Sequence, residues 1–114
     1  MHRTTTEVIE DHLVKRLKGQ VEEDLADNFS KDIIILSSFG VFEGHDGVRK
    51  SADKLKRDIG DAQFAYNHTQ IEGRYALLEW SAHKEEKKIV EGADSFVVED
   101  GKIIMQTIHY HSLD

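Results

Sequence analysis

The sequence contains neither cysteine nor proline among its 114 residues. Without cysteine it can form no disulfide, no thiolate nucleophile and no thiolate metal site. Without proline its turns must be made by glycine, aspartate, asparagine and serine. No apolar run approaches the roughly 20 residues of a membrane span, and residues 1–12 show no apolar signal segment. We therefore expect a soluble, cytoplasmic protein with no membrane association.

The chain is also poor in positive charge. It carries 15 lysines and arginines against 22 acidic residues, a net charge of -7 with neutral histidines. The acidic residues are spread along the chain and leave no basic face for a phosphate backbone, so we expect no nucleic-acid partner. The length suits one domain with room for a core, and we expect residues 1–114 to form a single domain.

Helices are expected mainly in the first half of the chain. The first follows a capping box, Thr4-x-x-Glu7, and shows apolar residues at a spacing of four. A second, shorter helix is predicted over residues 21–29. A third is predicted after a turn at residues 44–47, with Asp46 as its cap.

Strands are predicted from β-branched runs and from alternation with a period of two. The first covers residues 32–39, and residues 41–43 are expected to continue it around a bend. Two more follow at residues 62–72 and 75–83, before a final hairpin over residues 89–111. The order helix, helix, strand, helix, four strands predicts an α+β fold, in which helices cover one face of a mostly antiparallel sheet.

The most informative polar residue lies in the final hairpin. Asp94 shares one strand face with Gly92, Phe96 and Val98, because side chains alternate along a strand. If that face meets the core, Asp94 is a buried acid, and burial without a cationic partner raises the pKa of a carboxyl group. Asp94 is therefore a candidate acid or hydrogen-bond donor in a ligand pocket. The structural alternative is a carboxylate bound to backbone amides or paired with Arg74.

The order of elements and several short motifs resemble the nuclear transport factor 2-like superfamily, specifically its SnoaL-like and ketosteroid-isomerase-like branches. The resemblance covers nearly the whole chain. It is carried by Gly19-Gln-Val-Glu, Asn28-Phe-Ser-Lys-Asp32, Phe42-Glu-Gly-His-Asp-Gly47, Gly92-Ala-Asp-Ser-Phe and Glu99-Asp-Gly-Lys-Ile103. It implies a strongly bent sheet wrapped on three N-terminal helices around a cone-shaped pocket (a cystatin-like α+β roll), and a homodimer.

The resemblance also suggests which residues carry the chemistry. Ketosteroid isomerase builds an oxyanion hole from a tyrosine on its first helix and a protonated aspartic acid on its penultimate strand. Those positions correspond here to His12 and Asp94. The isomerase's general base corresponds to Ser37, and a serine is no base at neutral pH unless another group activates it. Ketosteroid isomerisation is therefore not expected. SnoaL-like cyclases, which use an aspartate in the pocket as acid and base, are closer to this pattern.

The loop of the final hairpin decides which side chains of the last strand join Asp94. With a two-residue loop, Asp100-Gly101, the side chains on the same face as Asp94 would be Met105, Thr107 and His109. A three-residue loop beginning at Glu99 would instead place there Ile104, Gln106, Ile108 and Tyr110. The family alignment favours the second, so we expect Gln106 and Tyr110 in the pocket.

Two histidines of the last strand, His109 and His111, have a spacing that can chelate zinc or iron. No spacing in the chain specifies a third ligand, and metal sites need an ordered outer shell. In the favoured register both histidines lie on the outer face of the sheet. We expect neither a metal nor a cofactor.

The sequence thus predicts a SnoaL-like domain that binds a small, partly apolar carbonyl or hydroxyl compound. If it is an enzyme, it is a cofactor-free isomerase, cyclase or dehydratase, with Asp94 as the acid and His12 assisting. The expected ligand-binding residues are Gln106, Tyr110, Ser37 and Trp80. The alternative is a non-catalytic dimeric binding or association module, which the missing base at Ser37 favours.

Overall fold

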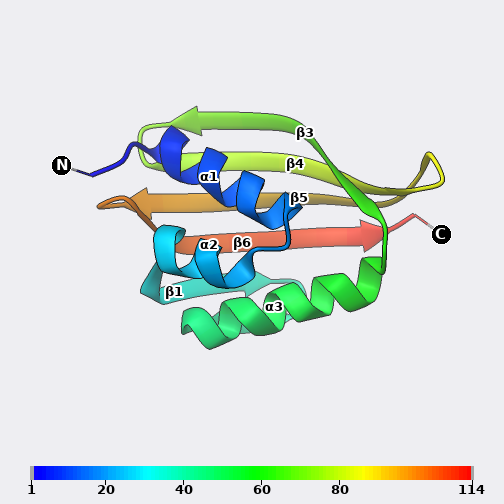
Figure 1. Cartoon of the computed structure of the whole chain (residues 1–114), viewed down its shortest axis with the longest axis horizontal. Helices are drawn as coiled ribbons and strands as arrows, with labels where there is room; N and C mark the ends of the chain where they lie inside the picture. Colours follow the sequence, from blue (N-terminus) through cyan, green and yellow to red (C-terminus); the bar gives the residue numbers. More distant parts are fainter. Residues whose placement is uncertain (1, 114) are drawn as a thin grey trace.

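A computed structural model describes residues 2–113. Its helices are α1 (Thr5–Leu17), α2 (Val21–Asn28) and α3 (Gly44–Ile59). Its strands are β1 (Phe29–Ser37), β2 (Gly40–Glu43), β3 (Gln63–Glu72), β4 (Tyr75–Lys84), β5 (Lys87–Glu99) and β6 (Lys102–Ser112). They form one sheet in the order β2-β1-β6-β5-β4-β3. Figure 1 shows all the helices lying against the same face of this sheet.

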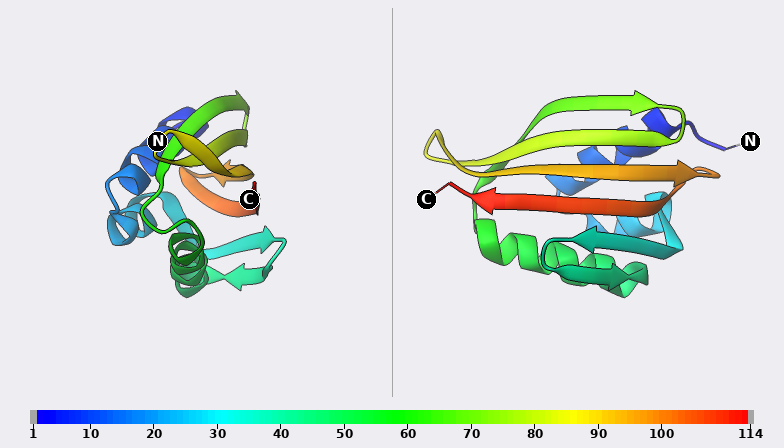
Figure 2. Two further views of the ribbon diagram at one scale, coloured as in Figure 1. Left: turned by 90° about the vertical axis from the view of Figure 1, so that its right-hand side faces the viewer. Right: turned by 180° about the vertical axis from the view of Figure 1, so that it is seen from behind.

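The predicted α+β fold, with its mostly antiparallel sheet, is confirmed. Strands β1 and β6, which are distant in sequence, pair in parallel and make the sheet mixed. The end-on view in Figure 2 shows the sheet curving around the helices, while its other face carries no helix. Among residues 2–113, no helix is both long enough and apolar enough to cross a bilayer.

The start of α1 follows the sequence signal. Thr4 Oγ1 accepts a hydrogen bond from the Glu7 amide at 3.1 Å, and Glu7 Oε1 accepts one from the Thr4 amide at 2.8 Å. This capping box satisfies backbone N–H groups that have no partner within the helix. The helix ends before Gly19, whose φ of 70° is a left-handed conformation that glycine adopts without strain.

Two expectations for the region after β1 are wrong. Residues 41–43 do not continue β1 around a bend; they fold back on it as β2, with Phe42 opposite Ile35. Residues 44–47 are not a turn but the first turn of α3. Asp46 does not cap this helix, because its carboxylate pairs with Arg49 at 2.6 Å. Gly47 lets α3 start so close to β2, since a Cβ there would lie 2.7 Å from the Phe42 carbonyl carbon.

The hydrophobic core lies between the helices and the concave face of the sheet. The first half of α1 contributes Val8 and Ile9, and β1 contributes Phe29, Ile33 and Ile35, all buried. The second half of α1 packs differently, because its inner side chains include His12 and Arg16 and line a cavity.

Candidate functional site

A cavity of about 650 Å³ lies between α1, α3 and the concave face of the sheet. That volume suits a small organic ligand. Most of its wall is apolar, formed by side chains such as Leu13, Ile35, Val48, Phe64, Leu78 and Ile108. The polar side chains that line it include Asp94, His12 and Arg16.

Asp94 projects from the middle of β5 into this cavity. Its Oδ1 accepts a hydrogen bond from Trp80 Nε1 at 3.1 Å, and its Oδ2 accepts one from Gln106 Nε2 at 3.2 Å. Burial raises the pKa of Asp94 to about 7, although both hydrogen bonds act in the opposite direction. The alternative partner Arg74 lies elsewhere, with its Nη1 3.8 Å from Glu99. Asp94 is thus a carboxyl group without a cationic hydrogen-bond partner among residues 2–113.

A glycine fixes the position of the Trp80 ring. Gly92 lies opposite Trp80 on the neighbouring strand. A Cβ at residue 92 would come within 2.4 Å of Trp80 Cζ2 and 2.9 Å of its Nε1. The indole therefore lies against the bare backbone of β5 at Gly92, and its N–H reaches the carboxyl group two residues further on.

Gln106 and Tyr110 line the cavity as expected. The three-residue hairpin loop on which this expectation rested is wrong. The hairpin loop is the two-residue type, Asp100-Gly101, and both residues have positive φ as a type I′ turn requires. An irregularity then shifts the register between Val97 and Val98. Beyond it Gln106 faces Phe96, and the same side-chain faces result as from a three-residue loop.

His12 is held in the cavity wall by a buried carboxylate that the sequence did not reveal. Its Nδ1 lies 2.7 Å from Oδ2 of Asp24 on α2, and Asp24 is fully buried. Burial lowers the pKa of His12, despite the opposing effect of this hydrogen bond. Burial alone would raise the pKa of Asp24, but the hydrogen bond with His12 and the charge of Arg16 outweigh it and lower that pKa. We therefore assign a neutral imidazole that donates from Nδ1 to an ionised carboxylate.

The second nitrogen of His12 faces the cavity. Among residues 2–113, no side chain hydrogen-bonds to Nε2, and no buried side-chain nitrogen or oxygen lacks a partner. Since Nε2 is not a buried orphan, it must be accessible from the cavity that the residue lines. The imidazole ring packs edge-on against Phe96, at 5.5 Å between centroids. Phe96 follows Asp94 by two residues on the same strand face, and both His12 and Asp94 line the cavity.

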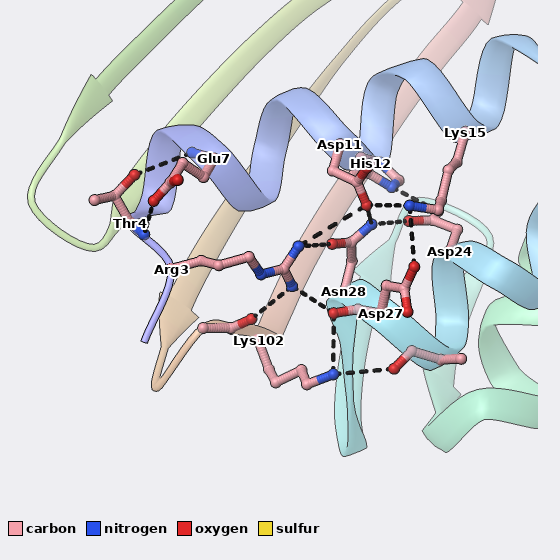
Figure 3. A network of polar contacts seen from close by, with 12 residues as sticks. Arg3, Thr4, Glu7, Asp11, His12, Lys15, Asp24, Asp27, Asn28 and Lys102 are labelled. Carbon is pink, nitrogen blue, oxygen red and sulfur yellow. Dashed lines mark hydrogen bonds and ion pairs between the residues drawn. The ribbon is translucent and has the colours of Figure 1, made fainter. Parts of the chain in front are cut away.

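Asp24 belongs to a wider polar network between α1 and α2 (Figure 3). Its Oδ1 accepts a hydrogen bond from Asn28 Nδ2 at 2.8 Å, and its Oδ2 accepts one from Arg16 Nε at 2.6 Å. Asn28 in turn accepts one from Arg3 Nη1 at 2.9 Å, and Arg3 also donates to the Gly101 carbonyl. The network thus connects the cavity histidine to the N-terminal segment and to the β5–β6 turn.

Tyr110 and Ser37 line the cavity but are engaged with other groups. The Tyr110 hydroxyl donates to Asp58 Oδ2 on α3 at 2.5 Å, so it bridges the sheet and the helix. The Ser37 hydroxyl donates to the Gly40 carbonyl at 2.9 Å and accepts from the Phe39 amide at 3.1 Å. Ser37 therefore serves the β1–β2 turn, and these contacts give it no activating base.

His109 and His111 are exposed on β6. His109 is on the outer face, opposite Ala93, while the inner face carries Gln106 and Tyr110. Within residues 2–113 no three histidine, aspartate or glutamate side chains come together as metal ligands.

Sequence reasoning missed Asp24 and Arg16. Arg16 follows His12 by four residues and so lies on the same side of α1. Asp24 lies beside Leu25 on the inner side of α2, and a carboxylate at a helical position adjoining an apolar stripe was a readable signal. Its partner could not be read, because that depends on how α2 docks on α1.

Comparisons with known proteins agree with this architecture. The sequence model of the SnoaL-like domain family matches residues 11–105. Among curated proteins there is no significant match. An NTF2-like protein of unknown function from Cytophaga hutchinsonii is 13% identical, with a TM-score of 0.72, and the match covers 98% of this chain and 92% of that one.

Two further solved structures are similar. A proposed SnoaL-like polyketide cyclase from Mesorhizobium loti is 13% identical, with a TM-score of 0.70, over 93% of this chain and 98% of that one. TerC, co-crystallised with polyporic acid, is 14% identical, with a TM-score of 0.73, over 91% of this chain and 88% of that one. At such identities the likeness establishes the fold alone.

Proposed function

The chain belongs to the SnoaL-like domain family, and from that premise we propose that its cavity binds a partly apolar carbonyl or hydroxyl compound. We further propose that it catalyses a proton-transfer reaction on this compound without a cofactor. Small-molecule binding by a related fold is supported by TerC, whose structure was determined with polyporic acid.

The observation that carries the proposal is the reversed order of two pKa values in one cavity. Burial raises the pKa of Asp94 to about 7, whereas burial lowers the pKa of His12 below its ordinary 6.5. Near neutral pH a substantial share of the Asp94 carboxyl therefore keeps its proton while the imidazole is neutral. A free aspartate would be almost fully ionised at this pH. An acid and a base are thus ready together at the same pH.

In the proposed reaction, His12 Nε2 removes a proton from a carbon next to the substrate carbonyl. Protonated Asp94 donates a hydrogen bond to the carbonyl oxygen, on which negative charge develops. The enol-like intermediate can take the proton back from His12 at another carbon, attack a second carbonyl group whose oxygen then takes that proton, or expel a hydroxyl group that leaves with it as water. Those outcomes correspond to an isomerase, a cyclase and a dehydratase. Trp80 and Gln106 orient Asp94, and Asp24 orients His12; Tyr110 and Ser37 contribute to the wall around the ligand.

The proposal is tested with 1-tetralone, a bicyclic ketone whose hydrogens next to the carbonyl can exchange with D₂O. We expect wild-type protein to accelerate this exchange, followed by proton NMR. His12→Gln and Asp94→Asn should each reduce the acceleration by about 100-fold, since each removes one partner of the proton transfer. His68→Gln is the control and should retain the wild-type rate, because His68 is exposed. Equal rates in all four proteins, or no acceleration by the wild type, would contradict the proposal.

A second candidate function is a non-catalytic dimeric binding module. It is favoured by the outer face of the sheet, where Leu36, Tyr75 and Leu77 are 44%, 53% and 40% exposed. Exposed apolar side chains on an otherwise polar surface are typical of interaction sites. Ligand binding without catalysed exchange would favour this alternative.

A further inference from the structure

Arg16 lines the cavity, yet it is not required by the proton transfer proposed above. It follows His12 by one helical turn, which places the two side chains next to each other on α1. Both contact the same oxygen of Asp24, His12 Nδ1 at 2.7 Å and Arg16 Nε at 2.6 Å. The guanidinium group therefore lies beside the imidazole at the cavity wall.

Only one edge of this guanidinium group is used. Arg16 donates to Asp24 through Nε, and within residues 2–113 neither of its terminal nitrogens makes a hydrogen bond. No buried side-chain nitrogen in that range lacks a partner, and the Arg16 side chain keeps 21% of its surface exposed. The terminal N–H groups are therefore accessible, on a side chain that lines the cavity. They form a planar fork that matches a carboxylate.

The fork is also held in place before any ligand arrives. Asp24 fixes it from one side, and the Phe29 ring lies 5.8 Å from the guanidinium carbon on another. The positive charge of Arg16 also acts on Asp94. Burial is the main cause of the raised pKa of Asp94, and the charge of Arg16 is one of the influences that oppose it. A preorganised donor pair loses little entropy when it binds an anion.

The other cations at the cavity are engaged differently or lie at its rim. Lys54 Nζ is 2.8 Å from Asp58 and 4.0 Å from the centre of the Phe39 ring. Lys56 is exposed on α3. Arg16 is thus the cation that borders both the apolar interior and His12.

We propose that Arg16 is an anion-binding residue of the cavity and that the ligand is an acid, an apolar ring compound carrying a carboxylate. This rests on the proposed function, because it takes the same cavity as the ligand site. The carboxylate binds the terminal N–H groups of Arg16, and the ring system fills the apolar part of the cavity. Since His12 is the neighbour of Arg16, the carbon that loses its proton lies close to the acidic group.

The test compares 2-naphthoic acid with 2-naphthamide, which has the same shape without the charge. Binding is measured calorimetrically at about pH 6, where the acid is ionised and much of Asp94 is protonated. Wild-type protein should bind the acid about tenfold to a hundredfold more tightly than the amide. Arg16→Gln should remove this preference while leaving amide binding unchanged. Arg49→Gln is the matched control, because Arg49 pairs with Glu22 and Asp46 at an exposed position; it should keep the preference.

A second measurement uses wild-type protein alone, so that it stands even if Arg16→Gln fails to fold. The Arg16 Nε–H signal in the NMR spectrum should move when 2-naphthoic acid is added and remain in place with 2-naphthamide. Equal affinity for both compounds, or an unchanged preference in Arg16→Gln, would overturn the anion site and leave the ligand cavity standing. Binding of neither compound would overturn the cavity as a ligand site, and the anion site with it.

Discussion

Replacing Asp94 with asparagine is expected to raise the free energy of unfolding by about 4 kcal/mol at about pH 8, and by less than about 1 kcal/mol at about pH 4. The cause is the difference between the pKa of Asp94 in the folded protein, about 7, and its ordinary value of 3.8. Between these values the folded protein keeps a proton that the unfolded chain has released. Stability therefore falls as the pH rises, until Asp94 ionises in the folded state.

Asparagine resembles the protonated acid and carries no charge at any pH, so the variant avoids this loss. Urea unfolding of both proteins at the two pH values measures the difference. Asp32→Asn, at an exposed position on β1, is the control and should match wild type at both. An Asp94→Asn variant no more stable than wild type at about pH 8 would show that burial does not strain this carboxyl group.

The predicted gain in stability would show that Asp94 lowers the free energy of unfolding near neutral pH. A gain of about 4 kcal/mol is a large fraction of the 5–15 kcal/mol that stabilises a typical domain. The same replacement is expected to reduce proton transfer about 100-fold. A group that lowers stability where it supports the reaction is typical of a functional site, since activity there opposes optimal packing.

The second large effect is expected at Asp24. Replacing it with alanine should lower the free energy of unfolding by about 3–5 kcal/mol, the cost of removing one partner from a buried ion pair. The change would leave Arg16 without its carboxylate and the buried amide of Asn28 with Asp11 in place of two carboxylate acceptors. Chemical unfolding at about pH 7 measures the loss.

Asp27→Ala is the matched control for that experiment. Asp27 also lies on α2, but its side chain is 56% exposed and pairs with Lys15 at 3.1 Å. An exposed pair of this kind contributes less than about 1 kcal/mol. Similar losses for the two variants would mean that the network in Figure 3 is not centred on Asp24.

The sequence predicted the fold well where the signals were local. The capping box at Thr4 and the strand predicted over residues 62–72 required only neighbouring residues, and both are present in the structure. The burial of β3 does not follow the predicted alternation, because its pairing with β4 is irregular between Tyr66 and His68. The first turn of α3 was mistaken for a turn because Gly44 and Gly47 read as loop residues. Only the packing against Phe42 shows why the helix needs a glycine.

The site was less predictable, because its geometry depends on contacts between distant segments. Asp94 could be placed on an apolar strand face from alternation alone. The side chains beside it depend on the register of β6. A one-residue irregularity near Val97 exchanges the two faces of β6, and no residue pattern in the sequence indicates it. The orientation of His12 depends on Asp24, which belongs to another helix. The cytoplasmic location, the single domain and the homodimer stay predictions.

The central claim is that Asp94 is an acid protonated near neutral pH inside a ligand cavity. It is tested most directly by a pH titration of the Asp94 carboxyl carbon by NMR, with the spectrum of Asp94→Asn identifying the signal. We expect a midpoint near 7. A midpoint near 4, the value of an ordinary exposed aspartate, would contradict it and remove the acid from the proposed reaction.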